Sequence, residues 1–407
     1  MSSITTTARS ETPSLVKRLG ANLQTYGLIG AVILIWLFFA FLTHGTFLGA
    51  RNISNLFRQM SVTAIMSVGM VLIIVTGGID LSVGRLAGFV SIVVSLCQMQ
   101  LWPRLIPQLF PGQDPVNFVV LTTLLSVLIG LVAGTLFGIY QGYIIAQLRV
   151  PAFIVTLGGL WALQGVILIV TGGSTISAKQ EVFLSIANGY LPTWAGAILA
   201  AAVTVFLFAS MVLSRRRKLK YGFELPAMYL DVLKTGIFAA VVIVYVYVVN
   251  QYNGVQSPVL ILAIVAMVVN YVSNNTRFGR YAYAIGGNRE AARLSGVNIR
   301  NNLFVIFILM GFLCGIAGVV LASYVGGGTP SAGSGMELDV IAACILGGTS
   351  TLGGEGTILG AMIGALIMAT LTNGLQLLNM PNEWQYVIKA GVLILAVYTD
   401  VRLRRNR

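Results

Sequence analysis

A few charged residues lie in or beside apolar segments, and they are the first candidates for chemistry in this chain. Of its 407 residues, 57% are hydrophobic and only 9% are charged. Because an ionised side chain is costly inside a membrane, a charge in such a place suggests an ion or substrate pathway. The acidic members are Asp80, Glu337, Asp339 and Glu355, and the basic members are Arg85 and Lys389.

Each of these charges also has a structural explanation that the sequence leaves open. Asp80 can pair with Arg85 or cap the helix that follows it. Negative charge suits a helix N-terminus, which would account for Glu337 and Asp339 at the start of an apolar segment. Lys389 can extend toward the membrane surface or pair with an acid.

Two glycine-rich breaks interrupt the apolar segments, at residues 76–84 (TGGIDLSVG) and 346–356 (LGGTSTLGGEG). Paired interruptions of this kind indicate duplicated units with broken helices. Irregular backbone survives at membrane depth only inside protein or against water. We therefore predict that both breaks line a pathway or its gate, and that cysteine at Ser82 or Ser350 reacts with a water-soluble thiol reagent. The predicted pathway or gate residues are Gly77, Gly78, Asp80, Ser82, Glu337, Asp339, Gly347, Gly348 and Ser350.

A polar, basic island at residues 279–296 (GRYAYAIGGNREAARLSG) predicts a docking element. Arginines concentrated in one loop mark it as cytoplasmic. Asn288 is the predicted N-cap of a short helix over 289–295, and Gly296 is its left-handed stop. Such a helix is too short to cross a membrane, so we interpret it as a surface for a partner. An ordinary positive-inside loop is the alternative.

Apolar segments set the fold class, an all-α polytopic membrane protein with about 12 transmembrane segments. The segments are 27–43, 59–76, 84–102, 116–140, 152–171, 195–213, 235–250, 257–273, 303–325, 338–348, 357–378 and 385–400. Basic clusters flank them, and twelve crossings place every cluster on the cytoplasmic side. The segment 338–348 is short enough to be a half-span.

The domain organisation that follows is simple. We expect residues 1–26 to form a cytoplasmic tail, 27–400 a transmembrane domain with a cytoplasmic loop at 274–302, and 401–407 a second cytoplasmic tail. Glycines at four-residue spacing, such as Gly130, Gly134 and Gly138, predict close helix packing. Gly311 pairs with Gly315 in the same way.

Composition and missing motifs exclude several classes of function. The net charge of +13 comes from clusters beside apolar spans, which indicates contact with anionic lipid rather than nucleic acid. The sequence has no Gly-Lys pair, hence no phosphate-binding loop, and no GxSxG or HExxH motif. Its three cysteines are far apart and are expected as buried free thiols rather than metal ligands. An enzyme is therefore not expected, and the chain is expected to bind no metal or cofactor itself.

An ordered series of motifs between residues 50 and 400 resembles the membrane permeases of bacterial ABC importers for monosaccharides, of the ribose and xylose type. The motifs include GGIDLSVG at 77–84, VPAFIVTLGG at 150–159, FGRYAYAIGGNREAARLSGVN at 278–298 and WQYVIKAGVLILAVYTD at 384–400. The resemblance implies a bacterial inner-membrane protein with both termini in the cytoplasm. It implies a homodimer, a separate ATPase subunit that binds ATP and Mg, and a soluble sugar-binding protein.

In this resemblance, Glu290–Ala291–Ala292 followed by Gly296 is similar to the motif by which importer permeases contact their ATPases. The implied coupling residues are Gly287, Asn288, Arg289, Glu290, Ala291, Ala292 and Gly296. An extra hydrophobic pair near 195–250, absent from ribose-type permeases, is closer to the xylose type. We therefore predict D-xylose as the cargo, with ribose, arabinose or galactose as alternatives. An ion-coupled transporter that uses Asp80, Glu337 or Asp339, or a channel, remains the alternative mechanism.

Overall fold

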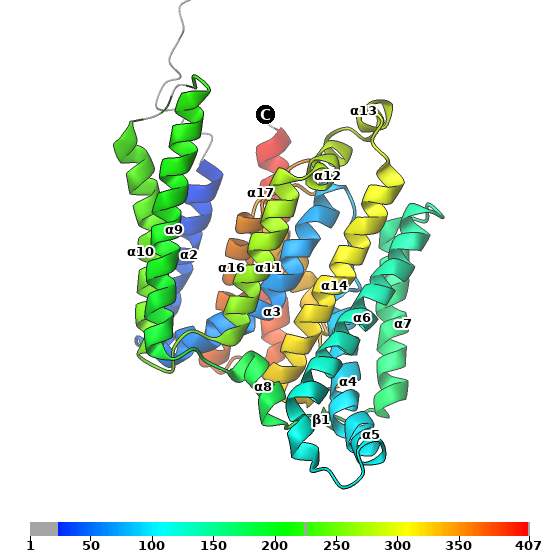
Figure 1. The fold of residues 1–407 in the computed structure, drawn as a ribbon. Coiled ribbons are helices and arrows are strands. Elements are labelled where there is room, and N and C mark those ends of the chain that lie inside the picture. The colour runs from blue at the N-terminus through cyan, green and yellow to red at the C-terminus, as the bar shows by residue number, and fades with distance from the viewer. Residues whose placement is uncertain (1–22, 224, 226, 406–407) are drawn as a thin grey trace, which may run out of the picture.

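The computed structural model describes residues 23–223, 225 and 227–405, and most of them lie in helices (Figure 1). The first half contains α2 (Leu23–Leu42), η1 (Thr46–Leu48), α3 (Ala50–Val75), α4 (Val83–Leu96), η2 (Cys97–Leu101), α5 (Trp102–Leu109), η3 (Pro115–Phe118), α6 (Val119–Ala146), α7 (Ala152–Thr171), β1 (Ile176–Ser177) and α8 (Glu181–Asn188). The second half contains α9 (Thr193–Lys220), α10 (Met228–Asn250), α11 (Ser257–Asn275), α12 (Arg277–Gly287), α13 (Arg289–Leu294), α14 (Ile299–Val325), β2 (Gly327–Gly328), α15 (Met336–Leu346), α16 (Ile358–Leu377) and α17 (Asn382–Arg405).

The centre of the bundle is α3. Every residue from Met60 to Val75 is buried, which is the pattern of a helix that is apolar on all sides and surrounded by other helices. It packs against α11, α14, α15 and α16. The first glycine break, residues 76–84, therefore follows directly from the most enclosed helix of the molecule.

The closest helix pair is α6 with α14, and glycines make the contact. A Cβ at Gly311 would lie 2.8 Å from the Gly138 Cα, and a Cβ at Gly134 would lie 3.0 Å from the Gly315 Cα. Such spacing leaves no room for side chains between the two backbones. The predicted close packing at these glycines is confirmed.

The predicted half-span is a short helix preceded by extended chain. With 11 residues, α15 is about 16 Å long, roughly half of a hydrocarbon core of about 30 Å. The chain before it includes β2, which pairs antiparallel with β1 by placing Ile176 opposite Gly328 and Ser177 opposite Gly327. From there it runs along α4, because Gly328 packs on Ile92 and Gly333 packs on the backbone of Gly88.

Each of the twelve predicted segments holds a helix. Among the described residues, nine helices are long and apolar enough to cross a membrane, with α4 and α5 counted as one. The three remaining predicted segments correspond to α2, α15 and α17. The all-α polytopic class is confirmed, and the number of twelve crossings stays a prediction. Two connections between predicted segments, 101–115 and 172–194, contain the short helices α5 and α8.

One end of the bundle gathers the regions that flank the basic clusters (Figure 1). We call it the α13 end, because α13 lies there together with the start of α2, the α9–α10 connection and the end of α17. The opposite end carries α5, α8 and β1. The basic run 215–220 continues α9 as helix, where Arg215 pairs with Asp231 of α10. The first 22 residues, most of the predicted N-terminal tail, lie outside the described residues.

The extra pair near 195–250 forms a hairpin, α9 and α10, at one edge of the bundle (Figure 1). The two helices pack mainly on each other, and a small cluster that includes Ile53, Val246 and Val249 joins them to α3. The hydroxyl of Tyr245 also donates to the Gln256 Oε1 at 2.5 Å. The pair is thus an addition to the bundle rather than part of its core.

Candidate functional site

The short helix α13 is built as its sequence predicts. The Asn288 side chain accepts a hydrogen bond from the Ala291 N–H at 2.9 Å, which caps the helix. Gly296 has φ +82°, a conformation that favours glycine, and it ends the turn after Leu294. The helical body stops at Leu294, one residue earlier than predicted. The predicted cap and stop are confirmed.

The surface of α13 is polar and exposed. Arg293 NH2 bonds to Glu290 Oε1 at 2.5 Å, and both side chains are 64% exposed. The hydrogen bond with Glu290 raises the pKa of the Arg293 guanidinium above its ordinary value. Of the short helix, only Ala292 is buried. A short, charged and exposed helix on a membrane protein is suited to bind a water-soluble partner.

The end of α3, the second glycine break and the helix before α13 meet at one junction. The Gly354 N–H of the second break donates to the Val75 carbonyl, which ends α3, at 2.8 Å. Gly286, in the last turn of α12, packs on this hydrogen bond. A Cβ there would overlap the Val75 carbonyl oxygen and lie 2.5 Å from the Gly354 nitrogen. The junction thus joins α3, α12 and the second break by backbone contact.

Side chains strengthen the same junction. The Tyr283 hydroxyl of α12 donates to the Gly356 carbonyl at 2.9 Å and accepts from the Ser273 hydroxyl of α11 at 3.2 Å. On the other side, the Asn302 amide of α14 donates to the Phe278 carbonyl at 3.1 Å. Therefore α12 is fixed to α11, α14 and the second break.

The first break is held by its own polar residues. Asp80 Oδ1 accepts from the Ser82 N–H at 2.8 Å and from the Ser82 hydroxyl at 2.7 Å. The Gln141 amide of α6 donates to the Ser82 oxygen at 3.0 Å. The local pair between Asp80 and Arg85 does not form, because Arg85 instead donates to the backbone carbonyls of 330 and 332. Asp80 thus organises the turn before α4.

Burial contradicts one prediction about the breaks. In this conformation Ser82 is fully buried and Ser350 is 2% exposed, so neither is positioned to react with a water-soluble reagent. Helix α6 covers Ser82. The turn of the second break covers Ser350, whose N–H donates to the Glu355 carbonyl. Ile79 and Leu352, 40% and 78% exposed, are accessible positions in the two breaks.

The acids of α15 occupy its first turn, as predicted, and differ in their partners. Asp339 Oδ2 accepts from the Lys389 ammonium of α17 at 2.8 Å, and both side chains are largely buried. This resolves the open alternatives for Lys389 in favour of pairing. Glu337 Oε2 is buried with no hydrogen-bond partner among the described residues, close to Gly84 at the start of α4. Of the predicted gate residues, these two acids lie apart from the junction.

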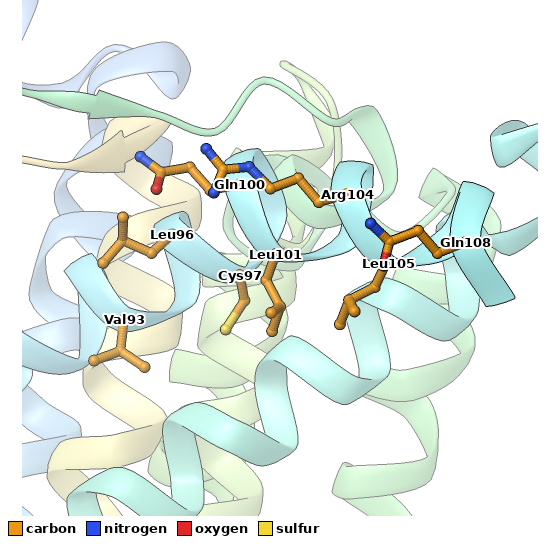
Figure 2. A pocket seen from close by; sticks show the side chains of 8 residues that line it. All are labelled: Val93, Leu96, Cys97, Gln100, Leu101, Arg104, Leu105 and Gln108. Atoms are coloured by element: carbon orange, nitrogen blue, oxygen red, sulfur yellow. The ribbon is translucent and has the colours of Figure 1, made fainter.

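Two hollows are large enough to hold a small molecule. The first, about 570 Å³, is lined by residues 93–108 only (Figure 2). Figure 2 shows that Gln100, Arg104 and Gln108 project from the same bent segment, α4 through α5. A groove formed by a single helical segment offers no groups that converge from several elements, so it is a weak binding site.

The second hollow, about 310 Å³, lies between α3, α14, α15 and α16. We call it the central cavity. Gln59, Tyr324 and Asp339 contribute polar atoms from three of these helices. The sequence analysis missed Gln59 and Tyr324, as it missed Gly286 at the junction. Gln59 could have been recognised from the sequence, because it is an amide in a predicted span. The roles of Tyr324 and Gly286 follow only from their contacts in the folded chain.

Comparison with known proteins agrees with this architecture. The family model described as branched-chain amino acid transport system / permease component matches residues 52–397. The xylose transport system permease protein XylH of Escherichia coli K12 is 40% identical over 386 residues, which cover 95% of this chain and 93% of the relative. XylH of Haemophilus influenzae is 39% identical over 96% of this chain and its own full length.

More distant relatives and the search of solved structures complete the comparison. The ribose import permease protein RbsC of Escherichia coli K12 is 33% identical, over 87% of each chain. No solved structure matches the chain significantly. The resemblance to ribose- and xylose-type permeases is confirmed. This multi-pass membrane protein belongs to the family of transport-system permease components.

Proposed function

We propose that this chain is the membrane-spanning subunit of an ABC importer that moves a monosaccharide, D-xylose first, into the cytoplasm. A separate ATPase powers it, and a soluble sugar-binding protein delivers the cargo. Higher identity to the xylose permeases than to the ribose permease, 40% against 33%, supports the choice of sugar. The α9–α10 hairpin, which the resemblance in sequence places closer to the xylose type, supports it as well.

The observation that carries the mechanism is the junction of α12 with the end of α3 and the second break. An exposed, capped helix, α13, that continues from a helix touching these points is what a separate motor needs to act on a pathway. Movement of α13 passes to α12 and, through Gly286, to the Val75 carbonyl and the Gly354 N–H. The end of α3 and the turn before α16 then shift together. An ion-coupled transporter has no ATPase to dock and needs no such contact.

The remaining partners follow from the same proposal. The α13 end is cytoplasmic, because arginine and lysine clusters gather there. The membrane is the bacterial inner membrane, and both termini face the cytoplasm. Two copies of this chain form the pathway, and the ATPase subunits bind ATP and Mg. This chain holds no cofactor or metal of its own.

Reconstitution tests the proposal. The purified chain is placed in liposomes with its ATPase, and its sugar-binding protein is added. Uptake of labelled D-xylose is then measured with and without ATP on the side of the membrane that the ATPase faces. We expect uptake that needs ATP and the binding protein, with D-xylose preferred over ribose, arabinose and galactose. Liposomes that contain only this chain should not accumulate sugar under a proton or sodium gradient. Accumulation under such a gradient would refute the mechanism.

A further inference from the structure

The central cavity has the size and lining of a small-molecule site. Its volume of about 310 Å³ lies at the lower end of the range usual for ligand pockets. Four helices contribute to its wall, so polar groups converge on it from different directions. The lining residues are Gln59, Val62, Thr63, Leu321, Tyr324, Met336, Asp339, Met368, Ala369, Thr372 and Gln376.

The strongest indication of a ligand is a buried amide oxygen that accepts no hydrogen bond. Gln59 Oε1 is buried and has no hydrogen-bond partner among the described residues, while its Nε2 donates to the Tyr324 hydroxyl at 3.2 Å. A buried acceptor without a donor has lost its hydration with no hydrogen bond to compensate. Because the Tyr324 oxygen already accepts from Gln59, its own proton is available to another acceptor. The pair thus offers one acceptor and one donor side by side.

Neighbouring residues fix this pair in place. The Arg58 guanidinium lies over the Tyr324 ring, 5.1 Å from its centre, and donates to Asn188 of α8 and to Asn55. On the opposite wall, Lys389 holds Asp339 at 2.8 Å. The cavity therefore presents a positioned amide, a phenol and a carboxylate, between apolar surfaces from Met336 and Met368.

This chemistry suits a neutral polyhydroxy compound better than an amino acid. The lining contains one carboxylate and no cation of its own, so a zwitterion would leave its carboxylate unpaired. Sugar hydroxyls can instead donate to the amide and carboxylate oxygens and accept from the phenol, while the C–H faces of the ring meet the methionines. The position also fits, because Gln59 precedes the first break by 17 residues of mostly helix, about 25 Å along α3.

We propose that the central cavity binds one monosaccharide on its way across the membrane, with Gln59, Tyr324 and Asp339 as its polar contacts. This inference rests on the proposed function and adds a cargo site within the permease itself. It predicts millimolar rather than micromolar affinity, since a transit site must release its cargo. The site lies in the half of α3 remote from the α13 end, upstream of the junction.

Protection of an introduced thiol tests the site directly. In full-length protein with Cys97, Cys314 and Cys344 replaced by alanine, Thr372→Cys places a thiol in the cavity wall. The protein is held in lipid nanodiscs without partners, and its reaction rate with a water-soluble methanethiosulfonate is measured. We expect D-xylose at about twice its Kd to slow labelling about threefold, because the free fraction is then one third. A disaccharide at equal concentration should not slow it.

Two matched variants make the result specific. Thr46→Cys, in the exposed turn between α2 and α3, should react at one rate with or without sugar. Adding Gln59→Met to the Thr372→Cys protein removes the amide at nearly equal volume and should abolish protection, leaving the unprotected rate unchanged. A thiol at 372 that never reacts, or that reacts equally with and without sugar, would overturn the site.

Failure of the proposed function can be distinguished from failure of the proposed cavity site. If the complete transporter accumulates D-xylose with ATP but Thr372→Cys shows no protection, only the central cavity is wrong. If no sugar is accumulated with ATP, the importer mechanism itself is wrong. If another sugar is taken up instead, protection by that sugar supports the site and its absence overturns it.

Discussion

At the scale of single residues, we expect coupling to depend on Gly286, a glycine that was not predicted from the sequence. Gly287 was among the predicted coupling residues, but a Cβ at Gly287 meets no atom within 4 Å, whereas one at Gly286 collides with two backbones. We expect Gly286→Ala to push α12 away from Val75 and the second break, at a cost of about 1–3 kcal/mol. Sugar-stimulated ATP hydrolysis by the reconstituted transporter should fall severalfold.

Gly287→Ala is the matched control, because it adds the same methyl group one residue further into open space. It should reach the membrane in the same amount and keep stimulated hydrolysis close to that of the unchanged chain. Basal hydrolysis and thermal midpoint, measured for both variants, separate a coupling defect from misfolding. Equal hydrolysis in the two variants would show that the Gly286 contact carries no motion.

The cap of α13 gives a second prediction at this scale. Asn288→Ala removes the bond to the Ala291 N–H and should weaken the short helix by about 1 kcal/mol. Because the helix is the proposed docking surface, affinity for the ATPase should fall by up to about fivefold, measured by titration of permease in nanodiscs. Asn288→Ser keeps a capping oxygen and should restore most of the affinity. A full loss in the serine variant would mean that the amide contacts the partner directly.

Residue pairings show where sequence reasoning ends. The cap at Asn288 and the stop at Gly296 were predictable, because each depends on neighbours within four positions. The partner of Lys389 was not, since Asp339 is 50 residues away. Nor was the separation of Asp80 from Arg85, because carbonyls of the chain before α15 compete for the arginine. Pairings of this kind depend on how helices cross, which spacing along the chain does not determine.

At the scale of elements, glycine packing between α6 and α14 should govern stability. Gly311→Ala places a methyl group against the Gly134 carbonyl and 2.8 Å from the Gly138 Cα, so the helices must separate. We expect a thermal midpoint several degrees lower in detergent. Gly165→Ala of α7, with nothing within 4 Å, is the control and should not lower the midpoint. Equal midpoints would show that the α6–α14 contact is loose.

The breaks yield a labelling prediction that replaces the one based on sequence. In a background without the three native cysteines, Ile79→Cys and Leu352→Cys should react readily with a water-soluble reagent, since both positions are exposed. Ser82→Cys and Ser350→Cys should react far more slowly. If the breaks belong to the gate, trapping the transporter with nucleotide should change these rates. Rates that stay constant in every state would assign the breaks to static packing.

Elements were predictable to the extent that apolar length defines them. All twelve segments hold helices, because about 20 apolar residues in a membrane protein leave few alternatives. The short helices α5, α8 and α12 were missed, since eight to eleven mixed residues carry no such signal. The broken helices were recognised from their glycines, but the contact of the second break with the end of α3 required the fold.

At the scale of the whole molecule, we predicted that all basic clusters lie on the same side of the membrane. The described regions that flank these clusters do lie at one end of the bundle (Figure 1). The start of α2, the α9–α10 connection and the end of α17 lie at the same end of the bundle as α13 (Figure 1). The hairpin of α9 and α10 is peripheral, because it is attached at one edge of the bundle. The other helices contact one another without it. Its removal would therefore leave the junction and the central cavity complete.

Stoichiometry is the last prediction. One chain presents one α13 and, within the described residues, one junction, whereas alternating access driven by paired ATPase sites needs two opposed halves. We expect two copies of this chain with two nucleotide-binding sites, on two ATPase subunits or on one fused double ATPase. Native mass spectrometry of the assembly extracted in lipid nanodiscs measures this directly, and glutaraldehyde crosslinking in native membranes provides the control against dissociation. A complex with one permease copy that still accumulates sugar would place the whole pathway inside a single chain.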